Sequence, residues 1–311
     1  MIRDSYLADM RRAYDRVSGA ASSTLSTDWG EIEFVDHGSG VPVLLSHGIF
    51  GGHDNAVEMV ESYVGRGFRT IGPSRFGYFG STLPEGATPA TQGDAYLDLL
   101  DHLDVDRVVV VGFSAGSPSA IQMALRQPHR LYGLILASAY LPGMASPLPT
   151  PVAPFLSMAL RWQFGWWLLK TWAPVLLGRI MGVPRDWPDT SDEDLDSIRE
   201  SLFPMQPKRS GVVFDTLVSE PACNRFPLEE ITVPTLVVHA ADDHLAPYKY
   251  APEAAIRIPG ARQVTVDSGG HLFLEHQAQV RQATAAFIEE VVGGTWLASG
   301  SFVRPSRERV S

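Results

Sequence analysis

The feature that most constrains the fold is a run of four valines that leads into a serine flanked by glycines. Val108–Val111 is wholly β-branched, which favours a buried strand. Gly112-Phe113-Ser114-Ala115-Gly116 follows at once, and residues 117–126 have the apolar spacing of a helix. A turn this tight requires small residues, because side chains there would clash with neighbouring backbone. The sequence therefore predicts a strand, a sharp turn that carries Ser114, and a helix.

Short apolar runs alternate with helical patterns on both sides of this turn. Further strands are expected at residues 31–35, 41–45, 69–71, 131–137, 235–239 and 263–266. Helices are expected in the first twenty residues and at 56–64, 91–102, 248–256 and 277–291. Unbroken apolar strands that alternate with helices are typical of a parallel sheet covered on both faces. We therefore predict an α/β fold with a mostly parallel central sheet.

The alternation stops near Pro142 and resumes at Thr235, and the segment between them is rich in proline and mostly helical in pattern. This interruption indicates a helical cap inserted into the α/β core. The expected divisions are a lead-in helix at 1–28, a core at 29–140 and 229–296, a cap at 141–228 and a flexible tail at 297–311.

The composition excludes several classes of protein. The balance of 25 basic against 35 acidic residues gives a net charge of −10, which argues against nucleic-acid binding. The single cysteine, Cys223, cannot form an internal disulfide or by itself a thiolate metal site. The N-terminus has no apolar run of signal-peptide length, and the uncharged stretch 131–160 contains five prolines. We expect a cytoplasmic protein without a membrane-spanning segment.

Several ordered motifs resemble those of the α/β-hydrolase superfamily, and the resemblance extends over residues 30–292. The turn around Ser114 resembles the G-x-S-x-G nucleophile elbow. His47-Gly48 follows an apolar run, as the oxyanion loop of the family does. The segment 73–81 resembles the D-x-R-G-x-G-x-S motif, but Ser74 replaces the usual aspartate. The resemblance implies the α/β-hydrolase fold, a serine nucleophile and a helical cap.

The resemblance also implies a catalytic triad. A serine hydroxyl needs a general base, and the base needs an acid that orients it. The family order of serine, acid and histidine makes Ser114 the nucleophile. The loop at 240–247 places the acid at Asp243, with Asp242 as the alternative. The base is expected at His271, just beyond the last strand.

The family register further implies that the backbone N–H groups of Ile49 and Ala115 form the oxyanion hole, with Phe50 as the alternative to Ile49. No phosphate-binding glycine motif follows a strand, and no metal-ligand cluster has suitable spacing. We therefore expect neither a cofactor nor a metal. Among the other histidines, His239 carries no functional signal.

The cap is expected to form the roof of an apolar substrate pocket. Five of the seven tryptophans lie between residues 162 and 187, and the only charges in 141–185 are basic. The expected pocket residues are Phe50, His53, Phe113, Trp162, Trp166, Trp167 and Leu245. For any one tryptophan the alternative is packing inside the cap. A membrane-surface helix is disfavoured, because Lys170 falls opposite Arg161 and Arg179 at helical spacing.

These features favour a cofactor-independent serine hydrolase that cleaves a small-to-medium apolar carboxylic ester or lactone through an acyl-enzyme. The same triad also suits a carbon–carbon bond hydrolase of the meta-cleavage type or a cofactor-free perhydrolase. A hypothesis from another class is a non-catalytic small-molecule receptor on this fold. The sequence does not separate these alternatives, and it does not indicate the oligomeric state.

Overall fold

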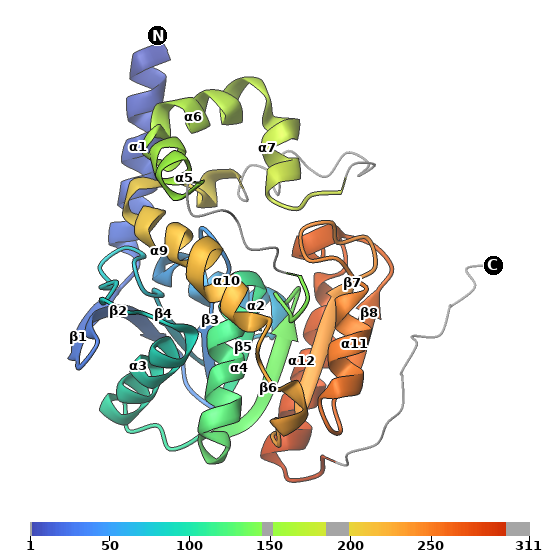
Figure 1. Ribbon diagram of the computed structural model, residues 1–311. Helices are drawn as coiled ribbons and strands as arrows, with labels where there is room; N and C mark the ends of the chain where they lie inside the picture. The colour runs from blue at the N-terminus through green and yellow to red at the C-terminus, as the bar shows by residue number, and fades with distance from the viewer. Residues whose placement is uncertain (1, 145–151, 185–198, 297–311) are drawn as a thin grey trace.

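The computed structural model describes residues 2–144, 152–184 and 199–296. Within them, eight strands form one sheet in the order β1-β2-β4-β3-β5-β6-β7-β8 (Figure 1). The strands are β1 (Ser23–Thr27), β2 (Gly30–His37), β3 (Pro42–Ser46), β4 (Arg69–Pro73), β5 (Val108–Phe113), β6 (Leu131–Ala137), β7 (Thr235–Ala240) and β8 (Arg262–Val266). β1 and β2 are antiparallel to their neighbours, and every pairing from β4 to β8 is parallel. The prediction of a mostly parallel sheet is confirmed.

Helices cover both faces of the sheet, as the uninterrupted apolar strands predict. Alternate residues of β5 point to opposite faces: Val108 and Val110 belong to one core cluster, and Val109 and Val111 to the other. The first cluster includes side chains of α3 (Pro89–His102), α4 (Ser117–Arg126) and α11 (Tyr250–Arg257), and the second those of α2 (Ala56–Tyr63) and α12 (Gln277–Val292). β5 is therefore buried along its whole length.

Strand β1 is not among the predicted elements. It reads Ser-Thr-Leu-Ser-Thr and pairs antiparallel with β2 at the edge of the sheet. Only Leu25 is apolar, and it packs against the core cluster that includes Phe34. A polar edge strand lacks the apolar alternation on which strand prediction depends, so tertiary pairing alone defines it here.

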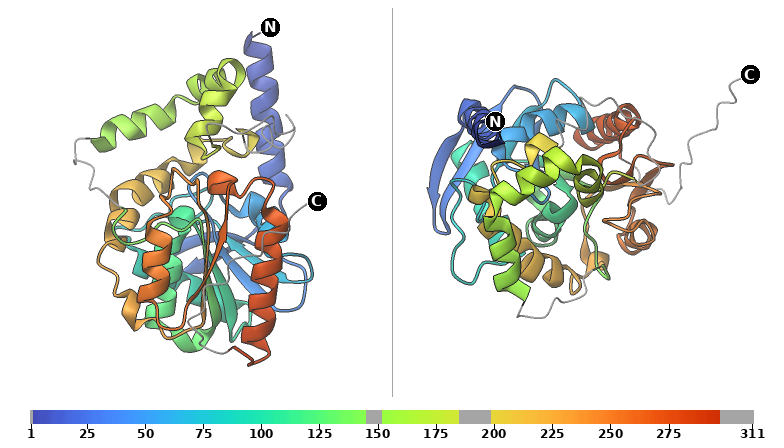
Figure 2. Two further views of the ribbon diagram at one scale, coloured as in Figure 1. Left: turned by 90° about the vertical axis from the view of Figure 1, so that its right-hand side faces the viewer. Right: turned by 90° about the horizontal axis from the view of Figure 1, so that it is seen from above.

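The cap lies above the carboxyl ends of the parallel strands (Figures 1 and 2). Its described helices are α5 (Val152–Arg161), α6 (Gln163–Trp172), α7 (Pro174–Ile180), α9 (Arg209–Phe214) and α10 (Glu220–Cys223), with a π-helical turn at Asp215–Ser219. The N-terminal helix α1 (Ile2–Gly19) stands beside them, and its Met10 and Ala13 share a core cluster with Trp167. The expected tail at 297–311 and two parts of the expected cap lie outside the described residues.

None of the helices in the described ranges combines the length and the apolar character that a membrane crossing needs.

Candidate active site

Ser114 occupies a sharp turn between β5 and α4. Its backbone φ is 50°, in the left-handed region that residues with a side chain rarely adopt. The flanking glycines are required by close packing: a Cβ added at Gly116 would lie 2.0 Å from the carbonyl oxygen of Ser46, and one added at Gly112 would lie 2.8 Å from Cβ of Ala120. The turn therefore holds the half-buried Ser114 side chain at the carboxyl end of β5.

The structure joins Ser114, His271 and Asp243 in one hydrogen-bonded row. His271 Nε2 lies 2.8 Å from Ser114 Oγ, and His271 Nδ1 lies 2.8 Å from Asp243 Oδ2. With Asp243 ionised, Nδ1–H donates to the carboxylate and Nε2 accepts from the serine hydroxyl. This is the geometry in which a histidine can take the proton of a serine.

The environment of Asp243 keeps its carboxylate ionised. Burial alone would raise its pKa, but the charge of His271 and hydrogen bonds from His239, His271 and Ala246 hold the pKa well below its usual range. Oδ1 accepts backbone N–H bonds from Leu245 and Ala246, both at 2.9 Å. The carboxylate is therefore fixed in both charge and orientation.

The neighbouring Asp242 has a different contact. Its carboxylate accepts the backbone N–H groups of Gly270 at 2.8 Å and Gly269 at 3.2 Å. It thus braces the loop that carries His271, and it is Asp243 that contacts the imidazole. Asp242 therefore binds the loop of His271, and Asp243 binds its ring.

Two backbone N–H groups flank Ser114 without a hydrogen-bond partner in the described part of the chain, those of Ile49 and Ala115. The loop that carries Ile49 approaches the serine closely, since a Cβ added at Gly48 would lie 3.2 Å from Cβ of Ser114. Free N–H groups beside a nucleophile are suited to receive the charge that develops on a carbonyl oxygen.

Both of these peptide groups are fixed through their carbonyls. The carbonyl of the Gly48–Ile49 peptide accepts from His47 Nδ1 at 2.8 Å, and that of the Ser114–Ala115 peptide accepts from the N–H of Tyr140 at 3.1 Å. Burial, followed by the nearby charge of Arg75, holds the pKa of His47 well below its usual value, so His47 is neutral. Neutral His47 donates from Nδ1 and accepts the N–H of Arg75 at Nε2, 3.0 Å away.

Phe50, the alternative donor, follows in the same loop with φ of 62°. Its carbonyl accepts from the buried ammonium of Lys208 at 2.6 Å, and Lys208 also donates to the carbonyl of Ser201 at 2.7 Å. Burial lowers the pKa of Lys208 to about 8. This lysine of the cap segment therefore anchors the loop beside Ser114.

A buried ion pair makes a second link between the core and the cap. Arg75 donates to both carboxylate oxygens of Asp215, at 2.6 and 2.5 Å, and to the carbonyl of Ala115 at 3.0 Å. Tyr78 donates its hydroxyl to the same carboxylate. Because both charges are almost fully buried, each depends on the other for compensation.

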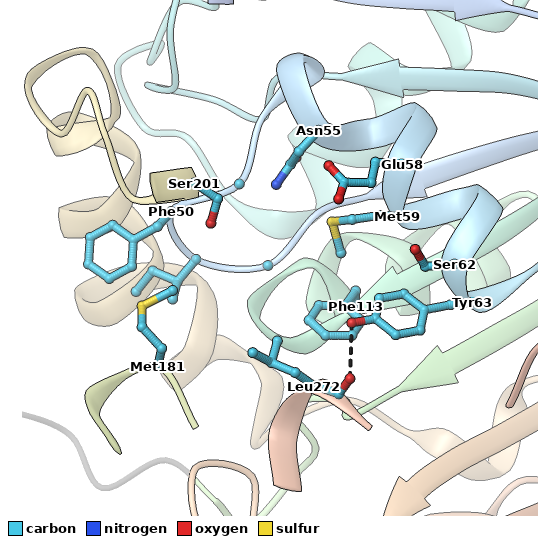
Figure 3. A pocket seen from close by; sticks show the side chains of 13 residues that line it. Phe50, Asn55, Glu58, Met59, Ser62, Tyr63, Phe113, Met181, Ser201 and Leu272 are labelled. Carbon is cyan, nitrogen blue, oxygen red and sulfur yellow. Dashed lines mark hydrogen bonds between the residues drawn. The ribbon is translucent and has the colours of Figure 1, made fainter. Parts of the chain in front are cut away.

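A cavity of about 150 Å³ opens beside the loop that carries Ile49 (Figure 3). Its core wall comes from that loop, from the residue before Ser114, from the residue after His271 and from α2, while Met181 and Ser201 line it from the cap. The lining residues are Gly48, Ile49, Phe50, Gly51, Asn55, Glu58, Met59, Ser62, Tyr63, Phe113, Met181, Ser201 and Leu272. A substrate whose carbonyl reached the two free N–H groups would have this cavity next to it.

Comparison with known proteins agrees with this geometry. The family model for the alpha/beta hydrolase fold matches residues 41–277. The chain belongs to the α/β-hydrolase family. It is 29% identical over 263 residues to an uncharacterized hydrolase, YcgS, of Bacillus subtilis (strain 168), covering 80% of this chain and 91% of the relative. It is 28% identical over 239 residues to the pimeloyl-[acyl-carrier protein] methyl ester esterase of Aromatoleum aromaticum (strain DSM 19018 / LMG 30748 / EbN1), covering 75% and 90%.

A solved structure shows the same relationship. The alpha/beta hydrolase fold protein from Nakamurella multipartita superimposes with a TM-score of 0.67 and 28% identity, covering 88% of this chain and all of that one. The protein is thus a hydrolase of the α/β family, as the resemblance implied.

Two of the residues expected in the substrate pocket of this hydrolase, Phe50 and Phe113, line the cavity. The other core residues lie elsewhere. His53 is buried and its Nδ1 bonds Ser74 Oγ at 2.9 Å, which gives the atypical Ser74 a structural contact. Leu245 is 41% exposed and lies beside the cap residue Gly182.

None of the three expected tryptophans lines the cavity. Trp167 is buried and donates its indole N–H to Asp9 of α1 at 2.7 Å. Trp166 donates to the carbonyl of Ala159 at 3.0 Å, and Trp162 is 65% exposed. An indole must bury a large ring and satisfy its N–H, and contacts with α1 and within the cap meet both needs for Trp167. The roof of the cavity instead comes from Met181 and Ser201.

The contacts of His239 in this hydrolase could not be predicted from the sequence. His239 is fully buried at the end of β7, with Nε2 2.6 Å from the carbonyl oxygen of Ala246 and 3.4 Å from Asp243 Oδ2. The one available signal is the spacing of four residues between His239 and Asp243. The spacing alone does not predict a contact, because the two side chains approach each other only through the turn that follows β7.

No group of three or more His, Cys, Asp or Glu side chains within the described ranges is arranged to hold a metal ion.

Proposed function

We propose that this hydrolase is a cofactor-independent serine hydrolase that cleaves a small-to-medium carboxylic ester or lactone through an acyl-enzyme. The observation that carries the proposal is the continuous row from Asp243 through His271 to Ser114, with 2.8 Å at both hydrogen bonds. This row activates a hydroxyl, which is the nucleophile that acyl transfer needs.

In the proposed acylation step, Ser114 Oγ attacks the substrate carbonyl carbon while its proton passes to His271 Nε2. Asp243 stabilises the imidazolium that forms, and the N–H groups of Ile49 and Ala115 receive the negative charge on the carbonyl oxygen. When the intermediate collapses, the carbon–oxygen bond of the ester breaks. His271 returns the proton to the leaving alcohol, which leaves the acyl group on Ser114.

In deacylation, His271 takes a proton from water, and the resulting hydroxide attacks the acyl carbon. A second tetrahedral intermediate collapses with Ser114 as the leaving group, and His271 Nε2 supplies its proton. The products are a carboxylic acid and the free enzyme. No cofactor takes part in this sequence of steps.

One observation bears on the size of the substrate and another on the bond that is cleaved. The cavity beside the reacting centre is about 150 Å³ and its walls include Ile49, Phe113, Met181 and Leu272. The relative from Aromatoleum aromaticum, named as a pimeloyl-[acyl-carrier protein] methyl ester esterase, is similar over 75% of this chain and supports an ester as the bond that is cleaved. Carbon–carbon bond cleavage and perhydrolysis require the same triad, and this relative favours ester hydrolysis over both.

The test is hydrolysis of 4-nitrophenyl esters from acetate to decanoate by the wild-type protein and by Ser114→Ala. We expect turnover that depends on acyl length and falls by at least about 1,000-fold in the variant. Thermal unfolding controls for the fold of Ser114→Ala. Hydrolysis that persists in a folded Ser114→Ala would refute the proposed nucleophile. A folded wild-type protein that cleaves none of these esters would refute the proposed ester hydrolysis.

A further inference from the structure

The cavity beside Ser114 has an uneven distribution of charge. Of its thirteen lining residues one is charged, Glu58 of α2, and none is basic. Asn55, Ser62 and Ser201 add uncharged polar groups around the same rim (Figure 3). Glu58 is exposed, and within the described ranges no ion pair involves it. Its carboxylate is therefore available to a ligand.

A stacked pair of aromatic rings extends from the wall of this cavity to the imidazole of His271. The ring of Tyr63 stacks on that of Phe113 with centroids 5.4 Å apart, and the Phe113 ring lies 5.6 Å from the imidazole of His271. Tyr63 donates its hydroxyl to the carbonyl of Leu272 at 3.1 Å, which fixes the ring at the cavity wall (Figure 3). A cavity lined by both aromatic rings and a carboxylate can offer an alkylammonium group cation–π contacts and a counter-ion.

One basic side chain, Lys208, contacts the backbone of this cavity, because it donates to the carbonyls of Phe50 and Ser201 at 2.6 and 2.7 Å. Two further basic side chains face a separate hollow. Arg66 and Arg281 line that hollow together with Glu61 and Ser62. Arg66 pairs with Glu61 at 3.2 Å, and Arg281 donates to the backbone carbonyl of Ser62 at 3.2 Å. None of these three basic side chains lines the cavity, so Glu58 supplies the one charged side chain among its lining residues.

We propose that this cavity receives a substrate arm that ends in an alkylammonium group, with Glu58 as the counter-ion and the Tyr63 and Phe113 rings as its apolar wall. The inference rests on the proposed function and narrows its substrate class to esters with a cationic arm. An uncharged arm of the same shape would contact the two rings but would not pair with Glu58. An anionic arm is disfavoured, because it would meet the Glu58 carboxylate.

The test compares two esters that have the same shape and differ by one charge, butyrylcholine and 3,3-dimethylbutyl butyrate. For the wild-type protein we expect kcat/KM to be about threefold higher for the choline ester, as an ion pair near the protein surface supplies. The ratio should fall to about one in Glu58→Gln and decrease with added salt. Glu61→Gln, one turn along α2 and outside the cavity, is the matched control and should keep the preference.

Equal rates for the two esters in the wild-type protein, or a preference that persists in Glu58→Gln, would overturn the inference.

A binding measurement separates this inference from the proposed function. In Ser114→Ala, calorimetry with choline and with 3,3-dimethylbutanol requires no turnover. We expect about threefold tighter binding of choline, lost in the Ser114→Ala/Glu58→Gln double variant. If choline is preferred but no ester is cleaved, only the proposed reaction fails. If esters are cleaved but choline and the neutral alcohol bind equally, only the cationic arm fails.

Discussion

The cap residue Gly182 lies directly against the catalytic histidine candidate, His271. The backbone N–H of His271 donates to the carbonyl of Gly182 at 3.2 Å, and Gly182 has φ of +94°. A Cβ added at Gly182 would lie 2.3 Å from Cβ of His271, closer than any real contact allows. The cap thus contributes to the position of His271 as well as to the wall of the cavity.

Replacement of Gly182 should therefore impair activity. In Gly182→Ala we expect kcat to fall by about tenfold or more, because the new methyl group displaces the His271 ring from Ser114. The matched control is Gly178→Ala in α7, where the nearest atom to an added Cβ is 3.6 Å away. The control should keep full activity. Similar kinetics for the two variants would show that the cap does not position His271.

The two adjacent aspartates should differ sharply in their contribution. Asp243→Asn removes the charge that stabilises the His271 imidazolium, so we expect kcat to fall by about 10,000-fold. Asp242→Asn retains an oxygen that can accept the N–H of Gly270, so we expect kcat of this variant to fall by about tenfold or less. Steady-state kinetics of both variants on one ester provides the comparison. A larger loss in Asp242→Asn would reverse the assignment.

The parts of the site that depend on local sequence could be predicted. The β-branched run Val108–Val111 predicts a buried strand, and β5 is buried. The glycines around Ser114 predict a tight turn, and an added Cβ at Gly112 or Gly116 would clash with neighbouring atoms. These two signals lie within a few residues of the feature they predict. His271 is expected from a wider pattern, the order of motifs in the family that the sequence resembles.

The parts that depend on contacts between distant segments could not be predicted. The partner of Trp167 is Asp9, 158 residues earlier, and that of Arg75 is Asp215, 140 residues later. The number of tryptophans in the cap indicates burial but does not distinguish a cavity wall from a helix interface. Nothing near Gly182 in the sequence predicts its contact with His271, which only the fold creates.

Loss of the Asp215 charge should destabilise the protein strongly. Asp215→Asn leaves the guanidinium of Arg75 buried without a counter-ion, which is expected to lower the free energy of unfolding by about 3–5 kcal/mol. Arg75→Met/Asp215→Leu removes both charges and should recover most of that stability in urea denaturation. It should not recover activity, because Arg75 also donates to the carbonyl of Ala115. A loss below about 1 kcal/mol in the single variant would contradict this account.

Glu220 should make stability depend on pH. Burial, followed by the charge of Asp215, raises the pKa of Glu220 to about 7, above the 4.5 of a free glutamate. The folded state therefore binds this proton more tightly than the unfolded state does, and stability declines as pH rises from about 5 to 8.

Glu220→Gln removes this titration. The variant should exceed the wild-type protein in free energy of unfolding by about 1–3 kcal/mol at pH 8, with little difference at pH 5. Glu230→Gln, at an exposed position, serves as the control and should follow the wild-type pH dependence. A constant difference between Glu220→Gln and wild type at all pH values would argue against titration of this carboxyl group.

Covalent labelling with a fluorophosphonate, which reacts with activated serines, tests whether Ser114 is the nucleophile. The label is located by mass spectrometry of the intact protein and its peptides. We expect one label per chain, on Ser114, and loss of labelling in a folded His271→Ala variant. Absence of labelling in the folded wild-type protein, or a label on another serine, would contradict the proposal that Ser114 is the activated nucleophile.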